Sequence, residues 1–178
     1  PNKISGFKAH ISGLIPVGAG LSSSASLTCG LLRGLNSLFD LGISKKDMAL
    51  IAQKVEHQYA GTPCGIMDQY AILFGKQEAA LYLNCQTLEH KLIDISLTDF
   101  QWVLFNSNVK HNLSDSAYLK RVKETKKALS IIQSEFPHYT HLAKVSLESL
   151  KKCKTKMDNK VYNRALYVIE EQNRVEQV

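Results

Sequence analysis

The chain has 178 residues, of which 44% are hydrophobic and 21% are charged, and its formal net charge is +6. This composition excludes a disordered, collagen-like or low-complexity chain, because enough apolar surface exists to offset the entropy lost on folding. No basic-then-apolar leader and no apolar run of about 18 residues occurs, so the sequence predicts neither a signal peptide nor a membrane span.

The first half of the chain predicts one strand and three helices. Imperfect apolar alternation over residues 7–15 indicates a strand. Leucines at steps of three and four residues predict a helix that begins near residues 22–24 and ends near residue 40. Ser44 is placed to cap a second helix that ends near residue 59, with Asp47 in the reciprocal position of a relaxed capping box. A loop rich in Gly and Pro follows, and then a short helix through Asp68 to about residue 74.

The second half predicts strands first and then helices. Strand-like runs cover residues 79–84, 90–95 and 102–107, and we expect Trp102 and Phe105 of the last run to lie in the core. Helical patterns follow over residues 114–135, over 146–153 and from 158 to the end, and Pro137 stops the first of them. Strands and helices do not alternate as in a doubly wound sheet, so the predicted class is α+β.

A turn rich in glycine and serine lies between the first predicted strand and the first predicted helix. Gly18 and Gly20 let the backbone approach an anion without a Cβ clash. The N–H groups and the dipole of the following helix favour negative charge, and serine hydroxyls can add donors or ligate Mg²⁺. The turn has neither the Walker pattern nor the dinucleotide G-x-G-x-x-G. Spacing alone fits a phosphate site and a plain capped helix equally well.

Two carboxylates, Glu56 and Asp68, lie next to apolar residues. A carboxylate in apolar surroundings is costly unless it is paired or binds a cation, so both are candidates for a metal or base role. The alternative is an ordinary surface Glu on a helix and an Asp favoured by a helix N-terminus. On the local pattern alone, this alternative is favoured.

Three segments resemble the GHMP small-molecule kinases, and the galactokinase branch in particular. The first is Pro16-Val-Gly-Ala-Gly-Leu-Ser-Ser-Ser-Ala-Ser26, which is similar to the second conserved motif of that family. The second runs from Glu56 through Cys64-Gly-Ile-Met-Asp-Gln69. The third runs from Asn106 to Tyr118, and after it one Arg and a Cys that are usual in the family are replaced around Arg121.

The resemblance implies a role for individual residues. Asp68 would be the catalytic carboxylate that faces the anomeric hydroxyl of the sugar, as base or orienting group. Ser24 and Glu56 would ligate Mg²⁺, and Gly65 and Tyr118 would contact the sugar together with Asp68. The residues implied to bind the nucleotide phosphates are Gly18, Ala19, Gly20, Leu21, Ser22, Ser23 and Ser24. The resemblance gives His57 and His111 no catalytic role, and ordinary hydrogen-bonding histidines are expected there.

The resemblance also implies a fold and a reaction. The fold would be the α+β GHMP kinase type: an incomplete ribosomal protein S5 domain 2-like N-terminal, ATP-binding domain over residues 1–96, and the start of a ferredoxin-like C-terminal domain over 97–178. The reaction would be ATP-dependent phosphorylation of a sugar at C1, most simply of galactose. The alternatives are a related kinase for N-acetylgalactosamine or arabinose, and a non-catalytic galactokinase-like sensor. ATP and Mg²⁺ are the implied cofactors, and a monomer is expected.

Two segments of the family pattern do not occur in this sequence. They are the first, Arg-containing sugar motif and the last, Gly-rich segment. Together with the start at Pro1 and not at Met, their absence indicates the central portion of such a kinase, and we expect this portion alone to be inactive.

The cysteines and lysines indicate compartment and partners. Cys29, Cys64, Cys85 and Cys153 lie far apart without a C-x-x-C pair, which favours reduced thiols in a cytoplasmic protein over disulfides or a zinc site. Lysine clusters at 120–127 and 151–160 are typical either of a polyanion-binding face or of a solvated helix surface, and we favour the surface. No aromatic residues interleave with the lysines, so no nucleic-acid partner is expected.

Overall fold

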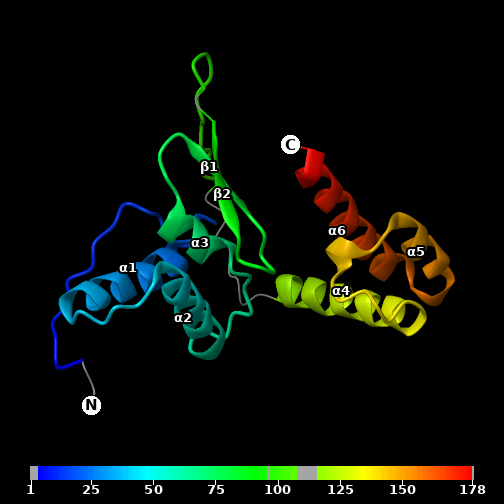
Figure 1. Cartoon of the computed structure of the whole chain (residues 1–178), viewed down its shortest axis with the longest axis horizontal. Coiled ribbons are helices and arrows are strands. Elements are labelled where there is room, and N and C mark those ends of the chain that lie inside the picture. The colour runs from blue at the N-terminus through cyan, green and yellow to red at the C-terminus, as the bar shows by residue number, and fades with distance from the viewer. Residues whose placement is uncertain (1–3, 96, 108–115, 178) are drawn as a thin grey trace. The chain divides into compact units, whose positions relative to one another are not determined.

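The computed structural model describes residues 4–95, 97–107 and 116–177 (Figure 1). The chain divides into two compact units, Pro1–Leu113 and Ser114–Val178. Among the described residues, the first unit holds three helices and a two-stranded sheet, and the second is helical. The α+β class is therefore confirmed. The predicted domain boundary near residue 96 stays a prediction.

Three helices form the centre of the first unit: α1 (Ser23–Leu38), α2 (Lys45–Gln58) and α3 (Met67–Phe74). They agree with the helices expected from periodicity. Each of the three packs against the other two. Their shared core consists of Cys29, Met48, Ala49, Ala52, Ile66, Tyr70 and Leu73.

The sheet is a single antiparallel hairpin within the described residues. Strands β1 (Ala79–Leu83) and β2 (His90–Asp94) pair in a register that joins Ala79 to Asp94 and Leu83 to His90. The hairpin is tied to α3 through Tyr70, whose hydroxyl donates to the carbonyl of Leu88 at 3.4 Å. Both strands were expected from the sequence, and both are confirmed.

Local capping explains where α2 begins. The Ser44 hydroxyl accepts a hydrogen bond from the Asp47 N–H at 3.1 Å and donates to the Asp47 carboxylate at 2.6 Å. The predicted capping pair therefore exists, although the carboxylate binds the Ser44 hydroxyl and not its backbone N–H. The bond satisfies one of the amides that the first turn of a helix leaves free.

Two predicted strands are absent from the structure. Residues 7–15 and 102–107 have no strand assignment. The core prediction for Trp102 and Phe105 is also wrong, because these side chains are 81% and 88% exposed. A strand requires a neighbouring strand for its backbone hydrogen bonds, and among the described residues β1 and β2 pair only with each other. Alternating apolar residues indicate that one face of a segment can be buried. They do not provide the neighbouring strand that a sheet requires.

The second unit packs helices against one another. It contains α4 (Ser116–Glu135), α5 (Leu147–Lys152) and α6 (Asn159–Gln177), with the 3₁₀ turns η1 (Leu142–Lys144) and η2 (Lys154–Lys156). Its core consists of Ala128, Ile132, Leu142, Val145, Leu150, Cys153, Met157, Val161, Ala165 and Ile169. An ion pair joins Arg164 of α6 to Glu124 of α4 at 3.2 Å. Within the described residues, the helices predicted over 114–135, over 146–153 and from 158 onward are confirmed, and residues 114, 115 and 178 lie outside the described part.

The lysine clusters lie on the surface of this unit. Lys127 pairs with Asp158, Lys152 with Glu148 at 2.7 Å, and Lys156 with Glu135, and all three lysine side chains are about half exposed or more. This is the arrangement of a solvated helix surface, as the sequence predicts. None of the helices in the described residues is long and apolar enough to cross a bilayer.

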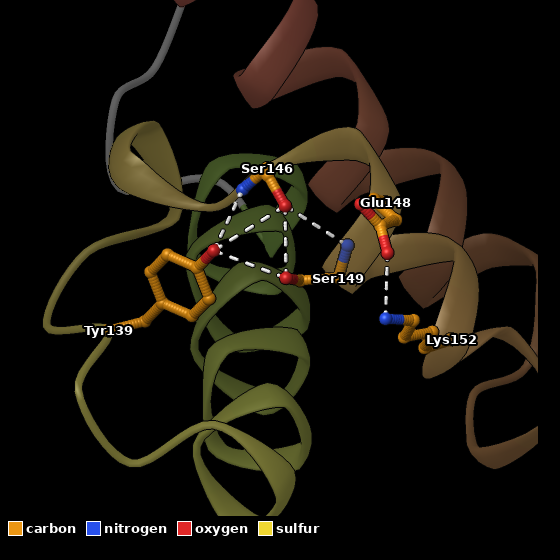
Figure 2. Close-up of polar contacts among 5 residues, drawn as sticks. All are labelled: Tyr139, Ser146, Glu148, Ser149 and Lys152. Atoms are coloured by element: carbon orange, nitrogen blue, oxygen red, sulfur yellow. Dashed lines mark hydrogen bonds and ion pairs between the residues drawn. The ribbon is translucent and has the colours of Figure 1, made fainter.

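A hydroxyl cluster fixes the connection between α4 and α5 (Figure 2). The Tyr139 hydroxyl lies 3.4 Å from Ser146 Oγ and 3.1 Å from Ser149 Oγ, and Ser146 caps α5 by accepting from the Ser149 N–H at 3.1 Å. Hydrogen bonds from Ser146 and Ser149 lower the pKa of Tyr139 below its ordinary value. The cluster holds the irregular segment after Pro137 at the start of α5.

We predict that Leu150→Ala destabilises the packed helices of the second unit. Leu150 is fully buried, and truncation of such a side chain costs about 3 kcal/mol, so the slowest amides of α4 and α6 should exchange about 100-fold faster. Hydrogen exchange followed by mass spectrometry measures this change. Lys151→Ala on the exposed face of α5 is the matched control, and an equal effect of both substitutions would contradict the packing described.

Candidate functional site

The glycine–serine turn has the backbone conformation that its composition predicts. Gly18 and Gly20 have φ angles of 78° and 75°, and Ser22 has a φ of 56°. This left-handed region is favourable for glycine and costs energy for residues with a Cβ. The turn therefore depends on both glycines, and it places the first turn of α1 directly after a tightly curved backbone.

The start of α1 is not capped by the residue before it. Ser22 is the N-cap and has a left-handed backbone, in place of the extended backbone of an ordinary N-cap, and its side chain makes no capping hydrogen bond. The N–H groups of Ser23, Ser24 and Ala25 are thus not satisfied by Ser22. Such amides, together with the helix dipole, favour an anion. This geometry fits the phosphate loop implied by the sequence.

A hollow of about 910 Å³ lies between the extended segment 7–17 and one face of α1. Ser23 and Ser24 line it together with apolar residues of α1, including Leu27 and Leu31. Neither predicted carboxylate lines this hollow. The described residues therefore place Ser23 and Ser24 at a largely apolar surface.

Glu56 lies in the last turn of α2 and is only 4% exposed. Its Oε1 has no hydrogen-bond partner among the described residues. The alternative of an ordinary surface glutamate is therefore wrong. Burial of the Cys29 thiol, with a smaller contribution from the Glu56 charge, raises the pKa of Cys29 to about 11. A buried carboxylate oxygen without a donor is costly, and a bound cation would offset that cost.

Asp68 lies in the first turn of α3 and is half-buried. Asp68 follows the loop that leaves the end of α2, where Glu56 lies. The charges of both acids add to the raised pKa of the Cys64 thiol in this loop, after the larger effect of burial. The structure therefore brings the two predicted carboxylates to the same loop. The start of a helix also stabilises a carboxylate at this position.

Cys64 connects this loop to two helices. Its carbonyl oxygen accepts hydrogen bonds from Gln53 Nε2 at 3.2 Å and His57 Nε2 at 2.8 Å, both on α2. Gln69 Nε2 of α3 lies 3.8 Å from the Cys64 sulfur. His57 is a hydrogen-bonding histidine, as expected. The role of the two glutamines was not foreseen, although the four-residue spacing of Gln53 and His57 puts them on one helix face.

The remaining predicted residues belong to different elements of the chain. Gly65 is exposed in the loop before α3, whereas Tyr118 lies on α4 in the second unit. His111 lies outside the described residues. Within the described part of the chain, no group of three His, Cys, Asp or Glu side chains could hold a metal ion. Glu56 and the Ser24 hydroxyl are oxygen donors of the kind that Mg²⁺ prefers, so a magnesium ion would need phosphate oxygens or water as further ligands.

One family model matches the first part of the chain. Residues 2–76 match the GHMP kinases N terminal domain. This range contains the glycine–serine turn, Glu56 and Asp68. The recognition of these motifs is therefore confirmed.

Curated relatives and a solved structure extend the similarity to nearly the whole chain. The galactokinase of Clostridium tetani is 40% identical over 97% of this chain and 44% of its own length. The galactokinase of Thermococcus kodakarensis is 36% identical over 97% of this chain and 47% of its own length. The crystal structure of Lactococcus lactis galactokinase complexed with galactose matches 91% of this chain and 42% of that chain, with 34% identity and a TM-score of 0.85. The chain thus spans less than half the length of these relatives.

We predict opposite effects for two glycine substitutions. Gly20→Ala should lower stability by roughly 1–2 kcal/mol, because alanine is strained at its φ of 75°. Gly30→Ala should raise stability by roughly 0.5–1 kcal/mol, because Gly30 lies inside α1 with no atom within 4 Å of the added Cβ. Urea unfolding followed by circular dichroism measures both, and effects of the same sign would contradict the turn geometry.

Proposed function

We propose that the protein is an ATP-dependent sugar-1-kinase, because residues 2–76 match the family model of the GHMP kinases N terminal domain. Its reaction converts ATP and D-galactose into ADP and galactose 1-phosphate. The observation that carries the choice of sugar is the match to the Lactococcus lactis enzyme, whose structure contains galactose. The galactokinases of similar sequence support the same choice.

The glycine–serine turn would hold the phosphates of ATP. The proposed contacts are Gly18, Ala19, Gly20, Leu21, Ser22, Ser23 and Ser24. The N–H groups at the start of α1 and the helix dipole stabilise the negative charge that phosphoryl transfer carries. The left-handed glycines allow the backbone to approach the phosphate oxygens closely.

Ser24 and Glu56 would hold Mg²⁺ through oxygen. A magnesium ion held by these oxygens would supply positive charge against the transferring phosphoryl group. Glu56 fits this role, because its buried Oε1 lacks a donor among the described residues. Burying a carboxyl oxygen without a donor lowers stability, and a bound cation would offset that cost.

Asp68 would act on the sugar hydroxyl. It orients the C1 hydroxyl and accepts its proton while the oxygen forms a bond to the γ-phosphorus, and the bond from that phosphorus to the bridging oxygen breaks to release ADP. Gly65 and Tyr118 would contact the sugar with Asp68. Catalysis here relies mainly on positioning and on charge stabilisation.

The proposal also includes the compartment and the oligomeric state in which the protein acts. The four cysteines are free, and we place the protein in the cytoplasm, where thiols stay reduced. We also propose that it acts as a monomer on a sugar and ATP.

We predict that Asp68→Asn lowers kcat by at least ~100-fold in the full-length protein, the usual scale for a lost general base. Initial rates of ADP formation with galactose measure this loss. Asp99→Asn changes an exposed acid of the same unit and should keep the normal rate. Normal turnover by Asp68→Asn would exclude Asp68 as the catalytic carboxylate. If the wild-type protein phosphorylates N-acetylgalactosamine or arabinose faster than galactose, that sugar is the substrate and galactose is not.

We predict that Glu56→Gln removes the stabilisation by Mg·ATP. A ligand at 100 times its Kd stabilises a protein by about 2.7 kcal/mol, so the wild-type Tm should rise with Mg·ATP and rise less with ATP and EDTA. In Glu56→Gln the two conditions should give the same Tm, because the cation ligand is lost. Glu78→Gln, an exposed acid of the same unit, serves as the control. A magnesium-dependent rise that persists in Glu56→Gln contradicts the ligand role.

A further inference from the structure

The Cys64 carbonyl receives two side-chain donors from α2. Gln53 Nε2 lies 3.2 Å from this oxygen and His57 Nε2 lies 2.8 Å from it. A carbonyl oxygen only accepts, so His57 Nε2 carries the proton of its bond. Gln53 and His57 are one helical turn apart and therefore approach the carbonyl from the same face of α2.

This carbonyl determines the direction of the next N–H group. The Cys64 C=O and the Gly65 N–H belong to one planar peptide unit, and the described residues contain no cis peptide bond. In a trans unit the two groups point in opposite directions. Since the carbonyl points to Gln53 and His57, the Gly65 N–H points away from α2.

A third contact holds the same residue from α3. Gln69 is 1% exposed, and its amide lies 3.8 Å from the Cys64 sulfur. It directly follows Asp68 at the start of α3. The loop is also tied to α2 by its backbone, because the Thr62 N–H donates to the Glu56 carbonyl at 3.0 Å. Cys64 is therefore held both by α2, which carries the proposed magnesium ligand Glu56, and by α3, which carries the proposed catalytic Asp68.

We propose that Gln53 and His57 are positioning residues, which act through the Cys64 carbonyl to aim the Gly65 N–H and to hold the loop that leads to Asp68. This inference rests on the proposed function, in which Gly65 and Asp68 contact the sugar. Neither positioning residue touches substrate in this scheme. Their loss affects the sugar side of the reaction and leaves the glycine–serine turn unchanged.

The kinetic test uses His57→Ala in the full-length protein. Loss of one of the two bonds should lower kcat/KM for galactose by about tenfold while the KM for ATP stays the same. His57→Gln should recover most of the rate, because its amide N–H can again donate to the carbonyl. Gln58→Ala, the next residue on α2 and also exposed, is the matched control and should behave as wild type. Wild-type kinetics in His57→Ala, or equal losses in His57→Ala and Gln58→Ala, overturn the positioning role.

A second measurement tests how firmly the loop around Cys64 is held, and it does not depend on enzyme turnover. Cys64 is half-buried and Cys85 is exposed, so the rate of iodoacetamide labelling at Cys64 relative to Cys85 reports how firmly the loop is held. The ratio should rise severalfold in His57→Ala and stay near wild type in His57→Gln and Gln58→Ala. An unchanged ratio in His57→Ala overturns the inference. The wild-type protein could fail to phosphorylate galactose while the Cys64-to-Cys85 labelling ratio still rises in His57→Ala. In that case the proposed function is wrong, and the role of His57 in holding the loop is supported.

Discussion

Close packing of α1, α2 and α3 is the constraint on which the rest of the first unit depends. Cys29, Ala49 and Ala52 are almost completely buried, and their small side chains allow the helices to approach closely. This packing carries the carboxylate of Glu56 into the interior and holds the loop that leads to Asp68 against α2. A larger side chain at any of the three positions would separate these helices. The proposed site would then lose its geometry even though none of its own residues had been substituted.

Helices and the hairpin could be predicted from the sequence, because their signals are local. Ser44 with Asp47 marks the start of α2, and the spacing of apolar residues gives the helical faces. The strands expected at residues 7–15 and 102–107 could not be judged this way, since a strand depends on a partner that is remote in sequence. The candidate residues were found because their motifs are contiguous. The burial of Glu56 and the bonds to the Cys64 carbonyl escaped prediction, because burial arises from tertiary packing and every residue has the same carbonyl.

Charge in the interior of the first unit is unbalanced in the described residues. Glu56 places a carboxylate next to two thiols, and burial keeps those thiols protonated, since the pKa values of Cys29 and Cys64 are both raised. A neutral thiol carries no charge and a thiolate would be a second anion, so neither cysteine can offset a carboxylate charge. The imbalance is consistent with a region that is completed only when a cation or a polar ligand binds. The Gly18–Ser24 turn shows the same tendency on the surface, where the first amides of α1 lack a cap from Ser22.

The exposed segment at residues 102–105 has a consequence for behaviour in solution. Trp102, Val103, Leu104 and Phe105 are each at least 60% exposed, and no charge interrupts them. An uncharged apolar stretch without strand partners is a template for pairing between copies. The net charge of +6 opposes such contact by electrostatic repulsion, which salt screens over about 10 Å at 0.1 M. The 178-residue chain should therefore stay dispersed in dilute buffer and associate as ionic strength rises, so purification at low salt should limit association between copies.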